Sequence, residues 1–168
     1  IAVLLGVLGE SGGTSVRRRL GAVWALSRIE TDSSLVPLRG ALSDRSADVR
    51  SAASRSLGIR GDRGAVPRLV EVLATDSSAA VRRQSATALG RILEVSGVSG
   101  TTETKSPTVA SLLSASARAG IDRFEEHAVL YAVIRTNDAA ATRPLLTDRR
   151  PAVRRAALIA LDQMPDGG

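Results

Sequence analysis

The stretch from Asp44 to Arg50 constrains the fold most, because its pattern returns at 76–82 and at 148–154. In each copy an Asp lies five residues before the Val of a Val-Arg pair, and a Leu lies eight residues after that Val. The copies begin at 44, 76 and 148, so they are separated by 32 and then by 72 residues. A period in the low thirties is typical of a solenoid of stacked helix pairs. The sequence therefore predicts an all-α solenoid.

About five antiparallel helix pairs are expected. The apolar face is clearest in the copy at 44, where Val49, Ala53 and Leu57 recur at helical spacing. Asp44 is expected to cap the helix that follows it. Two of the expected first helices end near 28 and 58, and two others cover 79–94 and 152–163. The expected second helices cover 34–42, 65–73, 106–118 and 142–146.

The period breaks at 95–105, where Gly, Ser and Thr dominate. This segment has no apolar face, so we expect a flexible loop inserted between two helices. Ser106 and Pro107 then have the composition of a helix start, with Ser as the cap and Pro in the first turn. The insertion explains the interval of 72 residues as two repeats plus a loop. Residues 1–168 are expected to form a single repeat domain, cut from a longer protein.

The composition excludes several kinds of site. The chain has no cysteine, which excludes disulfides, zinc-thiolate sites, iron–sulfur clusters and cysteine nucleophiles. No glycine-rich nucleotide-binding motif occurs, and no apolar run is long enough to span a membrane. We therefore expect no cofactor, no metal and no catalytic residues, and a chain that is not an enzyme.

These repeats resemble the HEAT-like repeats, in the short form first named for phycobilisome lyases. The pattern Asp-x4-Val-Arg-x2-Ala-x3-Leu-Gly, a turn, and Ala-Val-Pro-x-Leu-x3-Leu describes 44–73. It also fits 76–90 and 148–161, and more loosely 11–42 and 121–146. The resemblance implies a binding scaffold, because such repeats serve many different partners.

A narrower resemblance involves Glu126 to Ala132 and Arg154 to Met164. These segments are similar to the HEAT segment of large planctomycete proteins that carry a sugar-dehydrogenase-like propeller and a c-type haem domain. That resemblance implies an accessory domain of a haem- or dehydrogenase-like protein, in the periplasm rather than the cytoplasm. No Cys-x-x-Cys-His occurs in the chain, so none of that redox chemistry is placed here.

The most regular polar set in the sequence consists of the Asp and Arg of the three copies. One interpretation is a basic ladder for phosphates. The favoured one is structural, in which each Asp caps a helix and pairs with a repeat-related Arg, because the guanidinium fork satisfies two acceptors at once. The set comprises Asp44, Arg50, Asp76, Arg82, Asp148 and Arg154.

His127 and the few aromatic residues are weaker candidates for a site. His127 follows Glu125 and Glu126, but three adjacent helix positions cannot face one metal ion, so a packing or hydrogen-bonding role is expected. Trp24 and Tyr131 are suited to stacking on bases, yet so few aromatic residues at apolar-face positions favour the core.

The second helices are expected to line the concave face and to bind a partner. Their polar positions include Arg39, Arg68, Glu71, Arg118 and Arg143. Mixed charge on this face favours a protein or peptide segment over duplex DNA. The net charge of +6 leaves a nucleic-acid binder open, since some HEAT-like proteins resemble DNA-repair glycosylases with a basic concave face. A bilin-lyase-like or other cofactor-handling activity has the fold in its favour but no residue set to carry the chemistry.

Overall fold

Helices form most of the chain in the computed structural model, which describes residues 2–9, 15–95 and 102–165. In order they are α1 (Ala2–Gly9), α2 (Val16–Ser27), α3 (Leu35–Gly40), α4 (Ala47–Ile59), α5 (Val66–Thr75), α6 (Ala79–Val95), α7 (Thr102–Ala115), α8 (Arg123–Thr136), α9 (Ala139–Thr142) and α10 (Pro151–Asp162). Short 3-10 helices adjoin the second helices at Asp32–Ser34, Ala41–Ser43, Arg63–Ala65 and Arg143–Thr147. The described ranges contain no strand, and the all-α prediction is confirmed.

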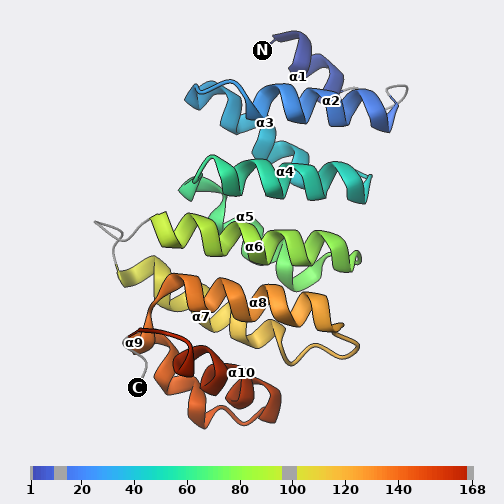
Figure 1. The fold of residues 1–168 in the computed structure, drawn as a ribbon. Coiled ribbons are helices and arrows are strands. Elements are labelled where there is room, and N and C mark those ends of the chain that lie inside the picture. The colour runs from blue at the N-terminus through green and yellow to red at the C-terminus, as the bar shows by residue number, and fades with distance from the viewer. Residues whose placement is uncertain (1, 10–14, 96–101, 166–168) are drawn as a thin grey trace.

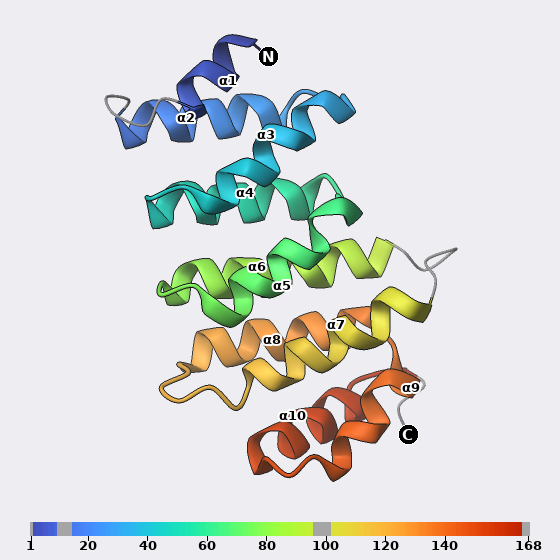
Figure 2. The ribbon, with the colours of Figure 1, turned by 180° about the vertical axis from the view of Figure 1, so that it is seen from behind.

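The helices form two rows that run along one stack. Helices α2, α4, α6, α8 and α10 make up the first-helix row, and each contacts the next. Helices α3, α5, α7 and α9 make up the second-helix row. The first row faces the viewer in Figure 1 and the second row does so in Figure 2. The two ends of the chain lie at opposite ends of the stack, which confirms the solenoid (Figure 1).

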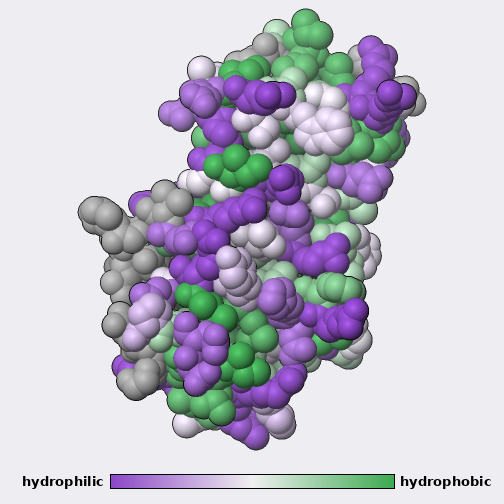
Figure 3. All heavy atoms as spheres, in the orientation of Figure 1, coloured by the Kyte–Doolittle hydropathy of each residue, from purple (hydrophilic) through white to green (hydrophobic). Residues whose placement is uncertain are grey.

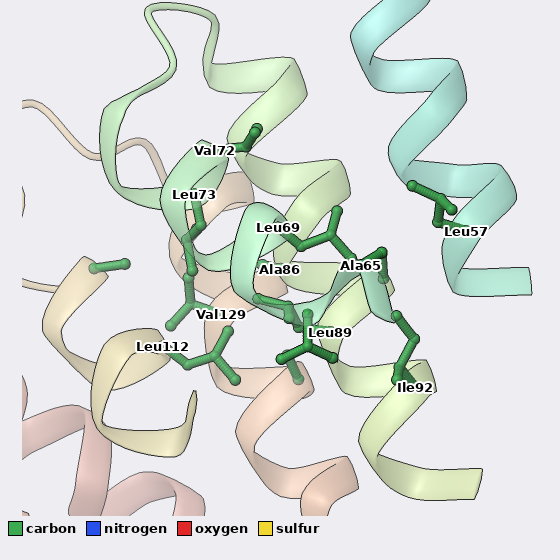
Figure 4. Packing of buried hydrophobic residues seen from close by; sticks show 14 of the residues in the cluster. Leu57, Ala65, Leu69, Val72, Leu73, Ala86, Leu89, Ile92, Leu112 and Val129 are labelled. Carbon is green, nitrogen blue, oxygen red and sulfur yellow. The ribbon is translucent and has the colours of Figure 1, made fainter. Parts of the chain in front are cut away.

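The core lies between the two rows and continues from repeat to repeat. The Leu that the sequence pattern repeats, at 57, 89 and 161, is buried in each copy. Figure 4 shows leucines of α5, α6 and α7 close together between the rows, namely Leu69, Leu73, Leu89 and Leu112. They belong to one apolar cluster that reaches from Val23 to Met164. A helix pair cannot bury its apolar face alone, so stacking is what closes this core.

Two glycines allow neighbouring first helices to approach closely. A Cβ on Gly58 would lie 2.7 Å from the Cα of Ala88, and a Cβ on Gly90 would lie 2.8 Å from the Cα of Ala132. Real side chains do not tolerate such distances to backbone atoms. The Leu-Gly of the repeat pattern therefore places a buried Leu beside a point of helix contact.

The structure differs from the expected loop at 95–105 at both ends of that range. Helix α6 ends at Val95, and α7 begins at Thr102, so residues 102–105 are helical. Residues 96–101 lie outside the described residues. The expected helix start at Ser106 and Pro107 is wrong, because Pro107 lies inside α7. Pro107 is the sixth residue of α7, where it removes one hydrogen bond of the helix, so a proline does not always mark the first turn.

The aromatic side chains lie at the surface, so their expected place in the core is wrong. Trp24 is 60% exposed and Tyr131 is 47% exposed. Trp24 belongs to α2 and Tyr131 to α8, so both lie on the first-helix row. The buried positions are filled by Ala, Leu and Val, and closely packed helices leave little room for large rings.

The described part of the chain has no helix that is long and apolar enough to cross a membrane.

Candidate functional site

The ladder residue Arg50 joins two successive repeats. Its Nε and Nη2 donate hydrogen bonds to the two carboxylate oxygens of Asp76, at 2.6 and 2.9 Å. Its Nη1 donates to the backbone oxygen of Asp44 at 2.8 Å. One guanidinium thus holds the loop before its own helix and the loop before the next first helix. The structural interpretation of the ladder fits this contact. We call each such ion pair between successive first helices a joint.

The first joint uses an arginine that the sequence pattern missed. Nε and Nη2 of Arg19 donate to the carboxylate of Asp44 at 2.8 and 3.1 Å. The Val-Arg pair at 16 and 17 suggested a different register, but Arg17 is exposed. The signal that would have found Arg19 is its position in the helix, since it is the fourth residue of α2 as Arg50 is the fourth of α4.

Asp44 does not cap α4 in the expected way. The N-cap residue is Ser46, which makes no side-chain cap hydrogen bond. Asp44 instead accepts a hydrogen bond from the backbone N–H of Ser46 at 2.7 Å, one residue before the helix. Asp76 accepts the corresponding bond from Ser78 at 2.8 Å. Each Asp therefore orders the loop before the helix and presents its carboxylate to the preceding repeat.

The joint between α6 and α8 takes its carboxylate from a helix. Nε and Nη2 of Arg82 each donate to a carboxylate oxygen of Glu125 at 2.7 Å. Glu125 is 1% exposed and lies in the first turn of α8, where the longer side chain replaces the loop Asp of other copies. Glu126, the fourth residue of α8, occupies the place of the ladder arginine and pairs with Arg155 of α10. At the joint between α8 and α10 the carboxylate therefore lies on the earlier helix and the arginine on the later one, the reverse of the other joints.

The last copy departs from the expected ladder, because α8 has Glu126 where the other first helices have the ladder arginine. Asp148 accepts hydrogen bonds from Arg150 in its own loop, at 2.9 and 2.8 Å. Within 2–9, 15–95 and 102–165, no arginine of the preceding repeat pairs with it. Arg154 repeats half of the pattern, since its Nη1 donates to the backbone oxygen of Asp148 at 2.8 Å. Among the described residues, no carboxylate pairs with Arg154, so the pair at 148 and 154 does not tie two repeats together.

The two aspartates of the regular joints should make folding sensitive to acid. Burial raises the pKa of Asp44 and of Asp76, but hydrogen bonds from Arg19 and Arg50 and from backbone N–H groups outweigh it. Both pKa values therefore lie below the ordinary value of 3.8.

Because these pKa values are lowered on folding, their stabilising contribution is complete above the ordinary value and is lost as the pH falls through the folded values. We expect the urea midpoint of unfolding to fall between pH 4 and pH 2, and Asp76→Asn to reduce this fall. Asp48→Asn, which changes an exposed carboxylate in α4 without a described ion pair, is the control. An equal pH dependence in both variants and the wild type would contradict the role of Asp76.

Two of the expected partner-binding residues make contacts that hold the stack together. Nε and Nη2 of Arg39 donate to the carboxylate of Asp62, at 2.6 and 2.5 Å. Nη2 of Arg118 donates to the backbone oxygens of Leu73 and Ala74 at the end of α5. These contacts tie α3 to the turn before α5 and the segment after α7 to the end of α5, so they occupy Nε and Nη2 of Arg39 and Nη2 of Arg118.

The remaining expected residues are more accessible. Arg68 and Glu71 form an ion pair on the surface of α5, in which the two side chains are 39% and 57% exposed. Arg143 is exposed at the end of the stack near α9. The structure therefore does not gather the five predicted residues into one site.

A groove of about 490 Å³ lies between α5 and α7 on the second-helix row. Figure 2 shows these two helices side by side on that face. The walls are mostly apolar and small, and two arginines stand at the edge. The lining residues are Val70, Leu73, Ala74, Ala110, Ser111, Ser114, Ala115, Ala117, Arg118 and Arg150.

The two arginines of the groove are held in place and still have donors available. Arg150 donates to Ser114 at 3.1 Å and to Asp148, and Arg118 lies 3.6 Å from Glu125. In the described part of the chain, Nη1 of both guanidinium groups has no hydrogen-bond acceptor. The groove thus combines a floor for small apolar groups with two fixed donors. The sequence pointed to Arg118 but not to Arg150.

The comparisons with known proteins agree with this architecture. The family model described as HEAT repeats matches residues 1–90 and 36–134. A solved structure of the complex of CpcE and CpcF of phycocyanin lyase from Nostoc sp. is 22% identical, with a TM-score of 0.64. The match covers 98% of this chain and 64% of that one. At this identity the likeness shows the fold alone.

Two further comparisons add little. Human deoxyhypusine hydroxylase in complex with glycerol is 15% identical over 97% of this chain and 95% of that one. Its TM-score of 0.48 is too low to support an argument. The search of curated proteins found no match.

The expectation that the chain is not an enzyme is corrected by these comparisons. The solved structure with a similar fold belongs to a phycocyanin lyase, so a solenoid of this kind does not exclude an enzyme. Residues 9–13 have the Gly-x-Ser-x-Gly spacing of a nucleophile elbow. Gly9 ends a helix, however, and a nucleophile elbow requires a strand before the turn.

Proposed function

Because this chain belongs to the family of HEAT repeats, we propose that it is a scaffold that holds a segment of a partner protein in the groove between α5 and α7. The observation that carries the proposal is the groove itself, with its apolar floor and two fixed arginines. The structure of CpcE and CpcF is a complex of two chains, which supports assembly with a partner.

The lining of the groove defines the chemistry of the segment. Its alanines and serines leave space for an extended chain with small or medium apolar side chains. Arg118 and Arg150 can donate to a carboxylate or to backbone oxygens of that chain. Because both arginines are already oriented by contacts within the protein, binding requires little ordering of their side chains. We therefore expect an extended segment with an apolar side chain beside an acidic one.

A peptide selection tests this proposal. A random peptide library displayed on phage is selected on the wild-type protein, and the selected peptides are measured by fluorescence anisotropy. Ala110→Trp fills the groove and should weaken binding at least about tenfold, a loss of about 1.4 kcal/mol. Thr87→Trp adds the same ring to α6 on the other row and should leave binding unchanged.

Circular dichroism must show that both tryptophan variants keep the helical fold. Peptides that bind all three proteins equally well, or a selection that yields no binder sensitive to Ala110→Trp, would contradict the groove as the binding site.

A further inference from the structure

Most of the positive charge lies on the first-helix row. Its five helices contain twelve arginines and five carboxylates. Three of the arginines belong to the joints. The other nine are exposed or half-exposed, namely Arg17, Arg18, Arg55, Arg83, Arg91, Arg123, Arg135, Arg154 and Arg155. Figure 3 shows hydrophilic side chains spread over this face, with pale and hydrophobic ones between them.

The second-helix row has a smaller excess of basic residues over carboxylates. Helices α3, α5, α7 and α9, together with the 3-10 helices beside them, contain five basic residues and three carboxylates. The basic surface is therefore on the row opposite to the one that the sequence suggested for nucleic acid.

The exposed side of α8 carries three rings in succession. Phe124, His127 and Tyr131 follow one another at intervals of three and four residues, so they share one side of the helix. Phe124 is 55% exposed and Tyr131 is 47% exposed. They are the only Phe, His and Tyr in the chain. In a chain that has so few rings, their gathering on one solvent-facing side points to a ligand.

Two of these rings each have an arginine guanidinium over them. The guanidinium of Arg123 lies 4.8 Å from the centre of the Phe124 ring, and that of Arg135 lies 5.5 Å from the centre of the Tyr131 ring. The rings of His127 and Tyr131 stack with an interplanar angle of 15°. Three flat rings thus lie in succession along one side of α8, with an arginine at each end.

The acidic groups near the rings are engaged elsewhere. Glu94 pairs with Arg135, and Glu126 pairs with Arg155. Asp122 caps α8 by accepting hydrogen bonds from the backbone N–H groups of Phe124 and Glu125, both at 2.8 Å. These contacts and the nearby charge of Arg83 lower the pKa of Asp122. Arg83 follows Arg82 in α6, and Arg82 binds Glu125, the residue after Phe124, so Arg83 lies on α6 near the start of α8.

We propose that this ring surface, formed by Phe124, His127, Tyr131, Arg83 and Arg123, binds single-stranded nucleic acid. Bases stack on the exposed rings and phosphates meet the arginines, a combination that binds single strands without sequence preference. The rise of an α-helix places the rings about 4.5 and 6 Å apart along the axis. This exceeds the spacing of about 3.4 Å along one strand of a duplex, which favours an unstacked strand. An acidic protein segment matches the charge but does not offer a flat group to each ring.

Fluorescence anisotropy with labelled oligouridine and oligothymidine of about 15 nucleotides tests the proposal. The full chain should bind at about 50 mM salt and should weaken about 50-fold by about 200 mM salt, if it contacts about four phosphates. Phe124→Ala combined with Tyr131→Ala should weaken binding at least about tenfold and leave the salt dependence unchanged. Arg83→Ala combined with Arg123→Ala should reduce the salt dependence, since fewer phosphates are contacted.

Controls separate stacking from charge. Arg63→Ala combined with Arg143→Ala removes the same charge from the other row and should change affinity less than about twofold if the site is on α8. Heparin, a polyanion without bases, should bind the ring variant as well as it binds the wild type. No binding of either oligonucleotide at low salt, or binding that the ring variant retains, would overturn the proposal. Preference for polyglutamate over the oligonucleotides would assign the surface to an acidic protein and overturn it as well.

Discussion

Replacing Glu125 with alanine should lower the free energy of unfolding by about 3–5 kcal/mol, because it leaves the Arg82 guanidinium buried without its partner. Glu125 is 1% exposed, and both of its oxygens accept hydrogen bonds from Arg82 at 2.7 Å. The pair also connects α6 to α8, which α7 separates along the chain. Urea denaturation followed by circular dichroism measures the change.

Two further variants show whether burial causes this loss. Arg155→Ala removes an ion pair whose arginine is 61% exposed, and such surface pairs contribute about 0–1 kcal/mol. Arg82→Met combined with Glu125→Leu removes both charges and should recover much of the stability lost in Glu125→Ala. If Glu125→Ala costs no more than Arg155→Ala, the joint does not hold the stack together.

The second large effect is expected for Leu57→Ala. Leu57 is fully buried in α4 and belongs to the continuous apolar cluster (Figure 4). Truncation leaves a cavity beside the contact between Gly58 and Ala88, where the backbones are too close to shift easily. The expected loss is about 2–5 kcal/mol, measured as a lower urea midpoint.

Ile59→Ala is the matched control for Leu57→Ala. Ile59 is also in α4, two residues away, but it is 56% exposed. Its truncation removes little buried surface, so the urea midpoint should stay nearly constant. An equal loss in both variants would show that position 57 is not a core position of the repeat.

The repeat spacing was sufficient to predict the stack and one of its joints. An Asp and an Arg at fixed distances from a Val predict contacts between neighbouring repeats, and Arg50 and Asp76 make that contact. Arg19 was missed because the local Val-Arg pair suggested a register shifted by two residues. The joint between Arg82 and Glu125 could not be predicted from the pattern, because a glutamate within α8 replaces the loop aspartate.

The candidate sites depend on contacts that one repeat does not contain. The groove forms where α5 meets α7, so Val70 and Ala110 line it together although 40 residues separate them. Arg150 joins the same groove from a third segment of the chain. The ring surface was overlooked because apolar rings at helical spacing predict a core. Small side chains fill the core instead, and the rings of α8 stay at the surface.

Nuclear magnetic resonance of the isotope-labelled chain tests most directly whether the two rows of helices bind different ligands. A peptide selected on the groove should shift backbone amide signals of α5 and α7, and an oligouridine should shift those of α8 and the facing side of α6. Adding both ligands should produce the two sets of shifts together, since the surfaces do not overlap. Shifts from both ligands at the same helices, or displacement of one ligand by the other, would contradict two separate binding surfaces.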